Sequence, residues 1–339
     1  MNILIALLVL GVIIFIHELG HFLAAKFFKM PVSEFSIGMG PQVYSYNTMK
    51  TTYSIRAIPI GGFVNIEGME VDSKVEDGFN TKPAYARFIV LIAGVFMNFL
   101  LAFVVLFFTI YSSGIYKADT SAVVGEIFPN VKAQEFIKPG DKIVKIDGIN
   151  IENWDDISKA ISKRKNEDFI EIELDRDKKI LTENVPLTKE KDSNKMFLGI
   201  VPKFIKEKIS VLEASKLSVK SGVKIFTDTL YGLKMVVTGK VKTQELTGPI
   251  GIIKVVGDAS KQGASMVLWL MALISVNIGV LNLMPLPALD GGRLIFVILE
   301  VLGIKVNKKL EEKVHLVGMI FLFALIIFIT TNDIFNLTK

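Results

Sequence analysis

The chain has 339 residues, a formal net charge of +5 and 51% hydrophobic residues, with no cysteine and three histidines. The lack of cysteine excludes a disulfide framework, a thiol nucleophile, an iron–sulfur cluster and a cysteine-ligated zinc finger. The mean hydropathy of +0.47 indicates a membrane protein with some soluble segments. The chain contains no run of five or more basic residues, so its charge does not indicate a nucleic-acid partner.

Four stretches are long and apolar enough to cross a membrane as helices, which takes roughly 20 residues for a hydrocarbon core of about 30 Å. They lie at about 2–28, 88–110, 266–289 and 314–331. No Lys or Arg precedes Lys26, so the first stretch lacks the basic start of a signal peptide and is predicted to be a retained span with its N-terminus outside. This order places residues 29–86 and 290–312 inside, and the long segment at about 113–262 outside.

Between the first two stretches, residues 52–68 (TYSIRAIPIGGFVNIEG) are predicted to form a hairpin. Every second residue from Tyr53 to Ala57 is apolar, and Gly61-Gly62 supplies a turn. The segment is apolar for a loop. It is either a surface hairpin or one that dips into the membrane from the inner side, with protein or a watery cavity covering its edges. In the second case an edge strand could pair with an unwound peptide segment.

Residues 119–202 lose the membrane character and are predicted to form a small α/β domain. Positions 138–149 (KPGDKIVKIDGI) combine a Pro-Gly-Asp turn, an alternating strand and an Asp-Gly turn. A helix at about 154–162 and a charged strand at 169–174 are expected to follow. The segment resembles a PDZ domain, which binds an extended peptide at a sheet edge. The alternative is a generic α/β domain that faces the solvent.

Residues 203–262 are predicted to be an outer amphipathic helical linker. Between 207 and 240, apolar positions recur at mixed helical spacing with lysines between them, which indicates one or two helices on the outer surface. The run Gly248-Pro249-Ile250-Gly251 is expected to break this pattern before the third apolar stretch.

The first apolar stretch contains the motif His17-Glu18-Leu19-Gly20-His21. On a helix, positions four apart share one face, so the imidazoles of His17 and His21 can reach one metal ion. Zinc suits such ligands and lowers the pKa of its bound water to about 7, and Glu18 is placed to take a proton from that water. Ionisable groups inside a membrane helix cost about 2.5 kcal/mol or more each, so they persist where they pair, bind metal or face water.

Two histidines leave a zinc site short of a third protein ligand. Asp290 is the better candidate, because two prolines unwind the chain before it and two glycines after it let the backbone approach closely. His315 is the alternative, in a charged context that is typical of a solvated helix end. The helix before His17 covers about 24 Å, which puts the motif nearer the inner face, where the third stretch also brings Asp290.

The HELGH motif, the Gly-Gly-Phe of the hairpin segment, the PDZ-like segment, the TGPIG run and NLMPLPALDGG together resemble the site-2 protease family of intramembrane zinc metalloproteases. The likeness is to its bacterial RseP and RasP branch, and it covers essentially the whole chain in the same order. It implies that Zn2+ is bound by His17, His21 and Asp290. It also implies that Glu18 is the catalytic base and that Asn282 takes part in substrate handling.

The resemblance further implies partners and a location. The expected partners are the lipid bilayer of the bacterial inner membrane and single-span protein or peptide substrates, such as anti-sigma factors or remnant signal peptides. The substrate helix must unwind first, and Gly61 and Gly62 mark where the hairpin could receive it as an added strand. The PDZ domain would lie on the outer face and admit pre-trimmed substrates, with the active site nearer the cytoplasmic side.

Two features depart from the usual family pattern. In the second stretch Asn98 matches a recurrent asparagine, but Val95 replaces a frequent proline. The outer segment also has room for a single PDZ domain, where some members have two. The first departure concerns the local helix geometry and the second concerns regulation, so neither touches the predicted chemistry.

We therefore expect an α-helical membrane protein with about four transmembrane helices, a membrane-associated β-hairpin and one inserted PDZ domain. The membrane core would have two halves, 1–118 and 263–339, around the PDZ domain (119–202) and the linker (203–262). A membrane metal transporter is one alternative, because metal ligands in spans also mark ion pathways. A non-catalytic PDZ scaffold is another. A Glu between the His ligands argues against the first, and two motifs at matching depth argue against the second.

Overall fold

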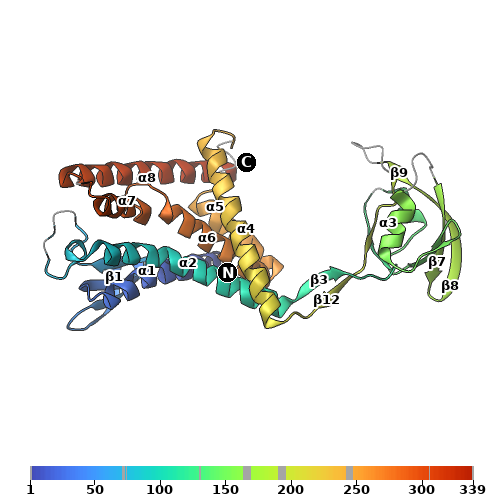
Figure 1. Ribbon diagram of the computed structural model, residues 1–339, viewed down its shortest axis with the longest axis horizontal. Coiled ribbons are helices and arrows are strands. Elements are labelled where there is room, and N and C mark those ends of the chain that lie inside the picture. The colour runs from blue at the N-terminus through green and yellow to red at the C-terminus, as the bar shows by residue number, and fades with distance from the viewer. Residues whose placement is uncertain are drawn as a thin grey trace. The chain divides into compact units, whose positions relative to one another are not determined.

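The computed structural model describes residues 2–70, 73, 75–129, 131–162, 169–189, 196–241, 247–304 and 306–337. The chain divides into a helical unit, made of Met1–Ser113 and Ser210–Lys339, and a β-rich unit, Gly114–Ile209 (Figure 1). The predicted range 119–202 lies inside the β-rich unit. The first and last strands of that unit, β3 (Ile115–Ala118) and β12 (Phe204–Glu207), pair with each other outside the predicted range.

Among the described residues, four helices of the helical unit are long and apolar enough to cross a membrane, as the sequence predicts. They are α1 (Asn2–Phe27), α2 (Ala84–Ser113), α6 (Ala264–Leu283) and α8 (Lys308–Leu337). The predicted third stretch is too long. α6 ends at Leu283, because Pro285 and Pro287 lack the backbone N–H that a continuing helix needs. A helix that the sequence did not predict, α7 (Asp290–Val301), begins after the prolines.

α1 and α2 approach each other closely at two glycines. A Cβ at Gly20 of α1 would collide with the backbone of Ala93, and a Cβ at Gly94 of α2 would collide with the imidazoles of His17 and His21. Bulkier residues at these points would hold the two helices apart. The glycines therefore let the histidine-bearing face of α1 lie directly against α2.

The predicted outer linker forms two helices, α4 (Val211–Val237) and α5 (Pro249–Gln262). α4 is a single helix, and its buried Ile225 packs against side chains of α2 and α6. α5 begins at Pro249, so the Gly-Pro-Ile-Gly run starts a helix and does not only interrupt one. A proline suits this first position, because the N–H that it lacks would have no partner within the helix.

The start of α5 is fixed by the buried Asp333 of α8. The carboxylate of Asp333 accepts hydrogen bonds from the backbone N–H groups of Gly248, at 3.0 Å, and Gly251, at 2.8 Å. The first N–H groups of a helix have no intrahelical partner, and the positive end of the helix dipole favours a carboxylate there. A Cβ at Gly248 would collide with Ile329 and Asp333, so this approach requires glycine.

We expect Asp333→Ala to lower the free energy of unfolding by about 1–3 kcal/mol, because two backbone N–H groups lose their acceptor. Thermal unfolding of the purified full-length protein in detergent measures the effect. Thr331→Ala is the matched control, since the exposed Thr331 hydroxyl bonds to the carbonyl of Ile327 in its own helix. An Asp333→Ala protein that unfolds at the same temperature as this control would contradict the anchoring role.

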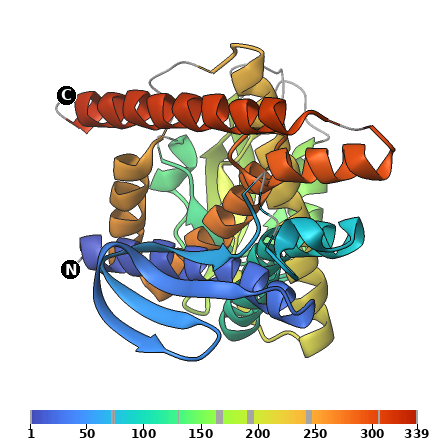
Figure 2. The same ribbon diagram turned by 90° about the vertical axis from the view of Figure 1, so that its left-hand side faces the viewer.

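The chain between α1 and α2 forms a sheet of two long bent strands, β1 (Val32–Asn47) and β2 (Thr52–Ile66). The first half of β1 lies between the two halves of β2, since Ile37 is opposite both Ile55 and Gly62. The prediction of a hairpin within 52–68 that turns at Gly61-Gly62 is therefore wrong. Both glycines lie inside β2, where Gly61 bends the strand with a φ of 82°. The sheet lies beside α1, away from α8 (Figure 2).

The β-rich unit is built around a four-stranded antiparallel sheet in the order β6-β5-β7-β8. Its strands are β5 (Lys142–Ile146), β6 (Ile149–Asn150), β7 (Phe169–Arg176) and β8 (Lys179–Pro186), and α3 spans Trp154–Ser162. Asp147 and Gly148 turn β5 into β6 with positive φ angles, which an Asp-Gly hairpin turn requires. The strand, turn and helix therefore form where the sequence predicts them.

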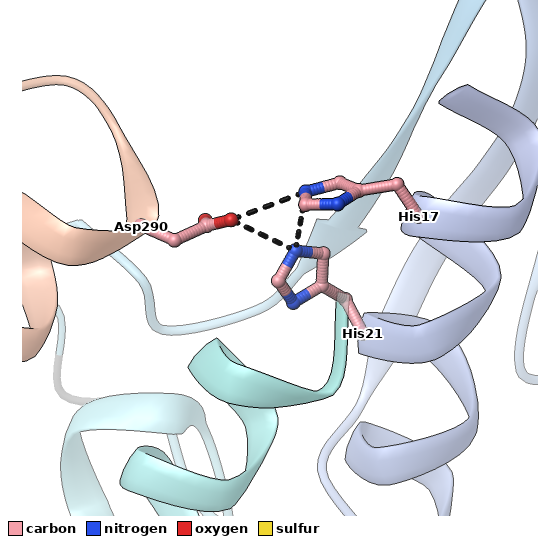
Figure 3. A group of neighbouring side chains, drawn as sticks. All are labelled: His17, His21 and Asp290. Atoms are coloured by element: carbon pink, nitrogen blue, oxygen red, sulfur yellow. Dashed lines mark hydrogen bonds and ion pairs between the residues drawn. The ribbon is translucent and has the colours of Figure 1, made fainter. Parts of the chain in front are cut away.

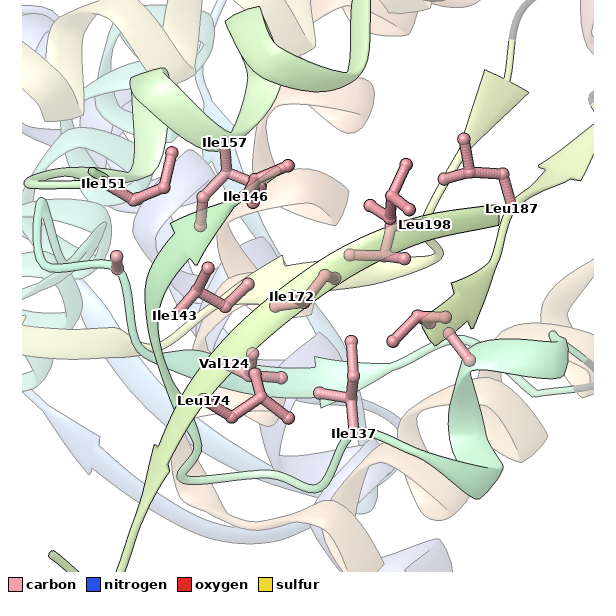
Figure 4. Packing of buried hydrophobic residues seen from close by; sticks show 14 of the residues in the cluster. Val124, Ile137, Ile143, Ile146, Ile151, Ile157, Ile172, Leu174, Leu187 and Leu198 are labelled. Atoms are coloured by element: carbon pink, nitrogen blue, oxygen red, sulfur yellow. The ribbon is translucent and has the colours of Figure 1, made fainter. Parts of the chain in front are cut away.

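The core of the β-rich unit is almost wholly aliphatic (Figure 4). Ile143 and Ile146 of β5 and Ile172 and Leu174 of β7 cluster there with Ile157 of α3. Two short strand pairs complete the unit, β4 (Val124–Ile127) with β11 (Ile200–Pro202), and β9 (Thr188–Lys189) with β10 (Met196–Phe197). The alternation of apolar residues along β7 points one of its faces into this core. On β5 the two buried isoleucines are three positions apart, with a register shift between Ile143 and Lys145.

Asp141, at the end of the Pro-Gly-Asp turn, is the buried anchor of this unit. Its side chain is 2% exposed and accepts two hydrogen bonds from Arg176 and one from the N–H of Lys138, each at 2.7 Å. Burial by itself raises the pKa of Asp141, but the hydrogen bonds from Arg176 and Lys138 outweigh it and hold the pKa below its usual value. The charged carboxylate therefore ties the turn to the end of β7.

We expect the β-rich unit to lose stability in acid through Asp141. Because the pKa of Asp141 is lower in the folded state, its contribution is complete above the unfolded value of about 3.9 and is lost as the pH falls through the folded value. Asp141→Asn should lower the free energy of unfolding by about 1–3 kcal/mol at pH 7 and by less toward pH 3. Hydrogen exchange of β5 and β7 in the full-length protein measures this, and an equal loss at both pH values would contradict it.

Candidate metal centre

His17, His21 and Asp290 come together in the helical unit (Figure 3). The Nε2 atoms of His17 and His21 lie 3.1 and 3.3 Å from Oδ2 of Asp290 and 3.2 Å from each other. Both histidines are buried, and Asp290 lies 273 positions after His17 in the sequence. The three residues predicted as metal ligands therefore present their donor atoms to one point.

The turn between α6 and α7 places Asp290. The chain leaves α6 at Leu283, and Asp290 is the first residue of α7. A Cβ at Gly291 or Gly292 would collide with backbone carbonyls of the segment that joins the two helices. These glycines let the first turn of α7 pack onto that segment, which directs the carboxylate of Asp290 back toward α1.

The three donor atoms fit a tetrahedral zinc ion. In such a site, bonds of about 2.0–2.1 Å put neighbouring donor atoms about 3.3–3.4 Å apart. The observed separations of 3.1, 3.2 and 3.3 Å are close to this distance. Two imidazole nitrogens and a carboxylate oxygen also form a donor set of catalytic zinc sites, which keep the fourth position open.

The second nitrogen of each imidazole faces α2. Nδ1 of His21 is 2.8 Å from the backbone carbonyl of Val90, to which it can donate its proton. A proton on Nδ1 leaves the lone pair of Nε2 free for a metal ion, as in many metal sites where an outer partner fixes the tautomer. Nδ1 of His17 lies 3.2 Å from the side-chain amide of Asn98. α2 therefore contacts both imidazoles on the side opposite the donor atoms.

Glu18 lies between the two histidines, and its carboxylate reaches the β1–β2 sheet. Oε2 of Glu18 accepts a hydrogen bond from the backbone N–H of Val64 at 3.1 Å. Val64 stands opposite Phe35 of β1, but its N–H points to Glu18 and not to β1. The edge of β2 that carries this N–H therefore faces Glu18 of α1.

Asn282 belongs to this site, and His315 does not. Nδ2 of Asn282, in the last turn of α6, lies 3.4 Å from Nε2 of His17. Nδ1 of His315 instead accepts a hydrogen bond from the backbone N–H of Ala288 at 3.3 Å. His315 thus supports the segment before Asp290, and the geometry favours Asp290 over His315 as the third ligand.

Sequence reasoning missed two groups at this site, both in the backbone. The N–H of Val64 and the carbonyl of Val90 carry no side-chain signature that a motif could reveal. Gly61 and Gly62, which the sequence singles out, lie on the same strand as Val64, just before it. Of these three residues, Val64 is the one whose N–H bonds to Glu18.

Comparison with known proteins finds a family model and relatives that match nearly the whole chain. A family model, Peptidase family M50, matches residues 5–325. A protein of Fusobacterium nucleatum named as a zinc metalloprotease is 52% identical over 337 residues, which cover 99% of each chain. The Bacillus subtilis protein named Regulator of sigma-W protease RasP is 29% identical over an alignment 411 residues long. The alignment covers 97% of each of the two chains.

One comparison with a solved structure concerns a smaller part of the chain. The PDZ domain of the SdrC-like protein from Listeria monocytogenes is 21% identical, with a TM-score of 0.23. The match covers 25% of this chain and 90% of that domain.

Proposed function

We propose, from the premise that this chain belongs to peptidase family M50, that it cleaves single-span membrane proteins inside the bilayer. By that membership the chain is a zinc metallopeptidase of the site-2 protease type. The observation that carries the proposal is the meeting of His17, His21 and Asp290 among helices apolar enough to lie in a membrane. No second group of this kind occurs in the described parts of the chain, which favours one catalytic centre over a series of ion sites.

The residues of the centre divide the chemistry of peptide hydrolysis. Zinc, when held by His17, His21 and Asp290, supplies a Lewis acid that polarises the scissile carbonyl and makes water a better nucleophile. The carboxylate of Glu18 takes a proton from the attacking water and passes it to the leaving amine nitrogen. The water oxygen bonds to the carbonyl carbon and the C–N bond breaks, so a carboxylic acid and an amine are formed.

We further propose that Asn282 handles the scissile carbonyl. Its side-chain amide lies 3.4 Å from Nε2 of His17, at the end of α6. An amide N–H at this place can donate a hydrogen bond to the carbonyl oxygen as negative charge develops on it. This contact would strengthen toward the transition state, which is what a catalytic contribution requires.

The open edge of β2 is the proposed docking place of the unwound substrate. A membrane helix keeps its carbonyls in its own hydrogen bonds, so it must open before cleavage. The N–H of Val64 lies on this edge next to Glu18, and Gly61 and Gly62 precede it on the same strand. A substrate strand added along the edge would pass its peptide bonds beside the catalytic base.

The proposed location is the bacterial inner membrane, with the metal centre nearer the cytoplasmic side. Lys26 lies in the last turn of α1 and Lys29 follows that helix, and Lys308 and Lys309 are the first two residues of α8. An excess of such basic residues marks the cytoplasmic ends of spans. The centre lies toward the same end of α1, because His17 and His21 are closer to Lys26 than to the start of the helix.

We assign the β-rich unit to the outer face, as a PDZ domain that controls entry. Its four-stranded sheet, its helix α3 and the turns at 138–149 support this assignment. A bulky outer domain on a substrate would be held back, and a trimmed stub would pass. Anti-sigma factors and remnant signal peptides are single-span chains of that kind.

Cleavage in liposomes tests the proposal. The liposomes contain the purified protein and a single-span substrate with an apolar segment of about 20 residues. The expected result is cleavage that a zinc chelator stops and added zinc restores. Zinc flux across the same liposomes without cleavage would support a transporter, and substrate binding without cleavage would support a scaffold. Either of these results overturns the proposal.

A further inference from the structure

The side chain of Asn98 is buried against His17, and its oxygen has no partner. Asn98 of α2 is 0% exposed, and its Nδ2 lies 3.2 Å from Nδ1 of His17. Oδ1 of Asn98 is one of the buried side-chain atoms of the described residues without a hydrogen-bond partner. A buried polar atom without a partner lowers the free energy of unfolding by about 1–3 kcal/mol. We therefore ask which orientation of the Asn98 amide lets its oxygen find a donor.

The proton of His17 decides which amide atom can face its ring. When Nε2 of a neutral imidazole binds a metal ion, its one proton is on Nδ1. That N–H is a donor, and the NH2 group of Asn98 is also a donor, so these two groups cannot form a hydrogen bond. The amide oxygen and nitrogen are close in size, and rotation of the terminal amide exchanges them without moving the backbone. With a metal ion on Nε2 of His17, a hydrogen bond between the two side chains would therefore require the oxygen of Asn98 to face Nδ1.

The backbone at Asn98 is held by α6. The hydroxyl of Ser275, which is buried, donates a hydrogen bond to the carbonyl of Asn98 at 2.8 Å. Gly279 lies one turn after Ser275 on α6, and a Cβ built at Gly279 would lie at ordinary contact distance from the Cβ of Asn98. α2 is thus fixed at this point, and rotation of the amide is the simplest change that can match Asn98 to His17.

The two zinc-facing histidines then have equivalent supports on α2. His21 donates from Nδ1 to the carbonyl of Val90, and His17 would donate from Nδ1 to the oxygen of Asn98. Val90 and Asn98 are eight residues, about 2.2 helical turns, apart on α2, and each contacts one of the two histidines of α1. One of these acceptors is a backbone group that no substitution removes, and the other is a side chain.

We propose that Asn98 is a positioning residue of the metal centre, whose amide oxygen accepts the Nδ1 proton of His17 and so fixes the tautomer that presents Nε2 to zinc. The inference rests on the proposed zinc site. An outer partner of this kind orients the ring and raises its basicity, and its loss typically costs 10–100-fold in metal affinity.

Two substitutions separate the acceptor from the donor of Asn98. Asn98→Asp keeps an oxygen toward His17 and removes the NH2 group, whereas Asn98→Leu removes both and keeps a similar volume. The zinc affinity of the full-length protein in detergent is measured by competition with a chelator. We expect Asn98→Leu to bind zinc about 10–100-fold more weakly and Asn98→Asp to bind it at least as tightly as the unsubstituted protein.

Asn277→Leu is the matched control. Asn277 is also an asparagine in an apolar helix, but its Oδ1 accepts a hydrogen bond from Thr229 of α4 at 2.6 Å. We expect this variant to keep its zinc affinity. An equal loss of zinc affinity in Asn277→Leu and Asn98→Leu would mean that both substitutions disturb the helical unit as a whole. That result would overturn the proposal.

Two further results would overturn it. If Asn98→Asp and Asn98→Leu lose affinity alike, the NH2 group is the part that matters. If neither loses affinity, Asn98 does not position His17. Should Asn98→Leu fail to fold, Asn98→Ala takes its place, with the same expected loss. An unsubstituted protein without zinc would contradict the proposed function itself, whereas unchanged affinity in Asn98→Leu and Asn98→Ala would contradict the role of Asn98 alone.

Discussion

Glu18→Gln is expected to keep its zinc and to lose cleavage by about 10²–10⁴-fold, the range for removing a positioned general acid–base group. The amide has the size of the carboxylate, and its oxygen can still accept the N–H of Val64, so the local packing remains. The amide cannot take a proton from water. Cleavage of a single-span substrate in liposomes and the zinc content of the same preparation are the two measurements.

Glu67→Gln is the control for this prediction, because it makes the same chemical change just after β2. We expect it to cleave like the unsubstituted protein. Normal cleavage by Glu18→Gln would show that Glu18 is not the base. Loss of zinc from Glu18→Gln would show that its carboxylate supports metal binding in addition to proton transfer.

Asp290→Ala is expected to lose both zinc and cleavage. Two imidazoles remain, but the carboxylate that completes the triangle of donor atoms is gone. The loss of affinity should exceed the 10–100-fold that is typical of losing an outer partner, because a direct ligand is removed. Competition with a chelator, on purified protein in detergent, measures the affinity.

His315→Ala distinguishes the two candidates for the third ligand. His315 bonds to the backbone of Ala288 and is not one of the three donor residues, so its removal should weaken zinc binding far less than Asp290→Ala does. An Asp290→Ala protein that binds zinc normally, together with a His315→Ala protein that does not, would mean that the third ligand is His315.

The sequence predicted the four long helices because a run of apolar side chains is a local signal. The same is true of the strand, turn and helix of the β-rich unit, where Asp147-Gly148 requires a particular backbone geometry. The pairing of Asp290 with His17 and His21 is not local. It could be predicted because the apolar helices limit the depth at which each motif can lie, and the structure brings these three residues together.

The strand pairing of the β1–β2 sheet could not be predicted from the local sequence pattern. Alternation along 52–57 indicates a strand, but it does not tell which strand will pair with it. The sequence pattern suggested that Gly61-Gly62 folds β2 back on itself, whereas each half of β2 pairs with β1. A glycine that permits a bend in a strand has the same signature as one that permits a turn.

Long-range polar contacts explain the other differences. The TGPIG run has a helix-breaking composition, but its two glycines serve the approach of Asp333, a residue some 80 positions away in α8. Likewise, the prolines after α6 predict that the helix ends, and they do not reveal that α7 starts at Asp290. Such features depend on packing between distant segments, which a single sequence does not encode locally.

The position of the cut in the substrate tests most directly the central claim, that peptide hydrolysis takes place within the bilayer at the centre formed by α1 and the start of α7. Mass spectrometry of both product fragments from the liposome reaction locates it. We predict a cut inside the apolar segment of the substrate, made by the unsubstituted protein and absent with Glu18→Gln. Cuts confined to the polar flanks, or a cut inside the segment that persists in Glu18→Gln, would contradict this account.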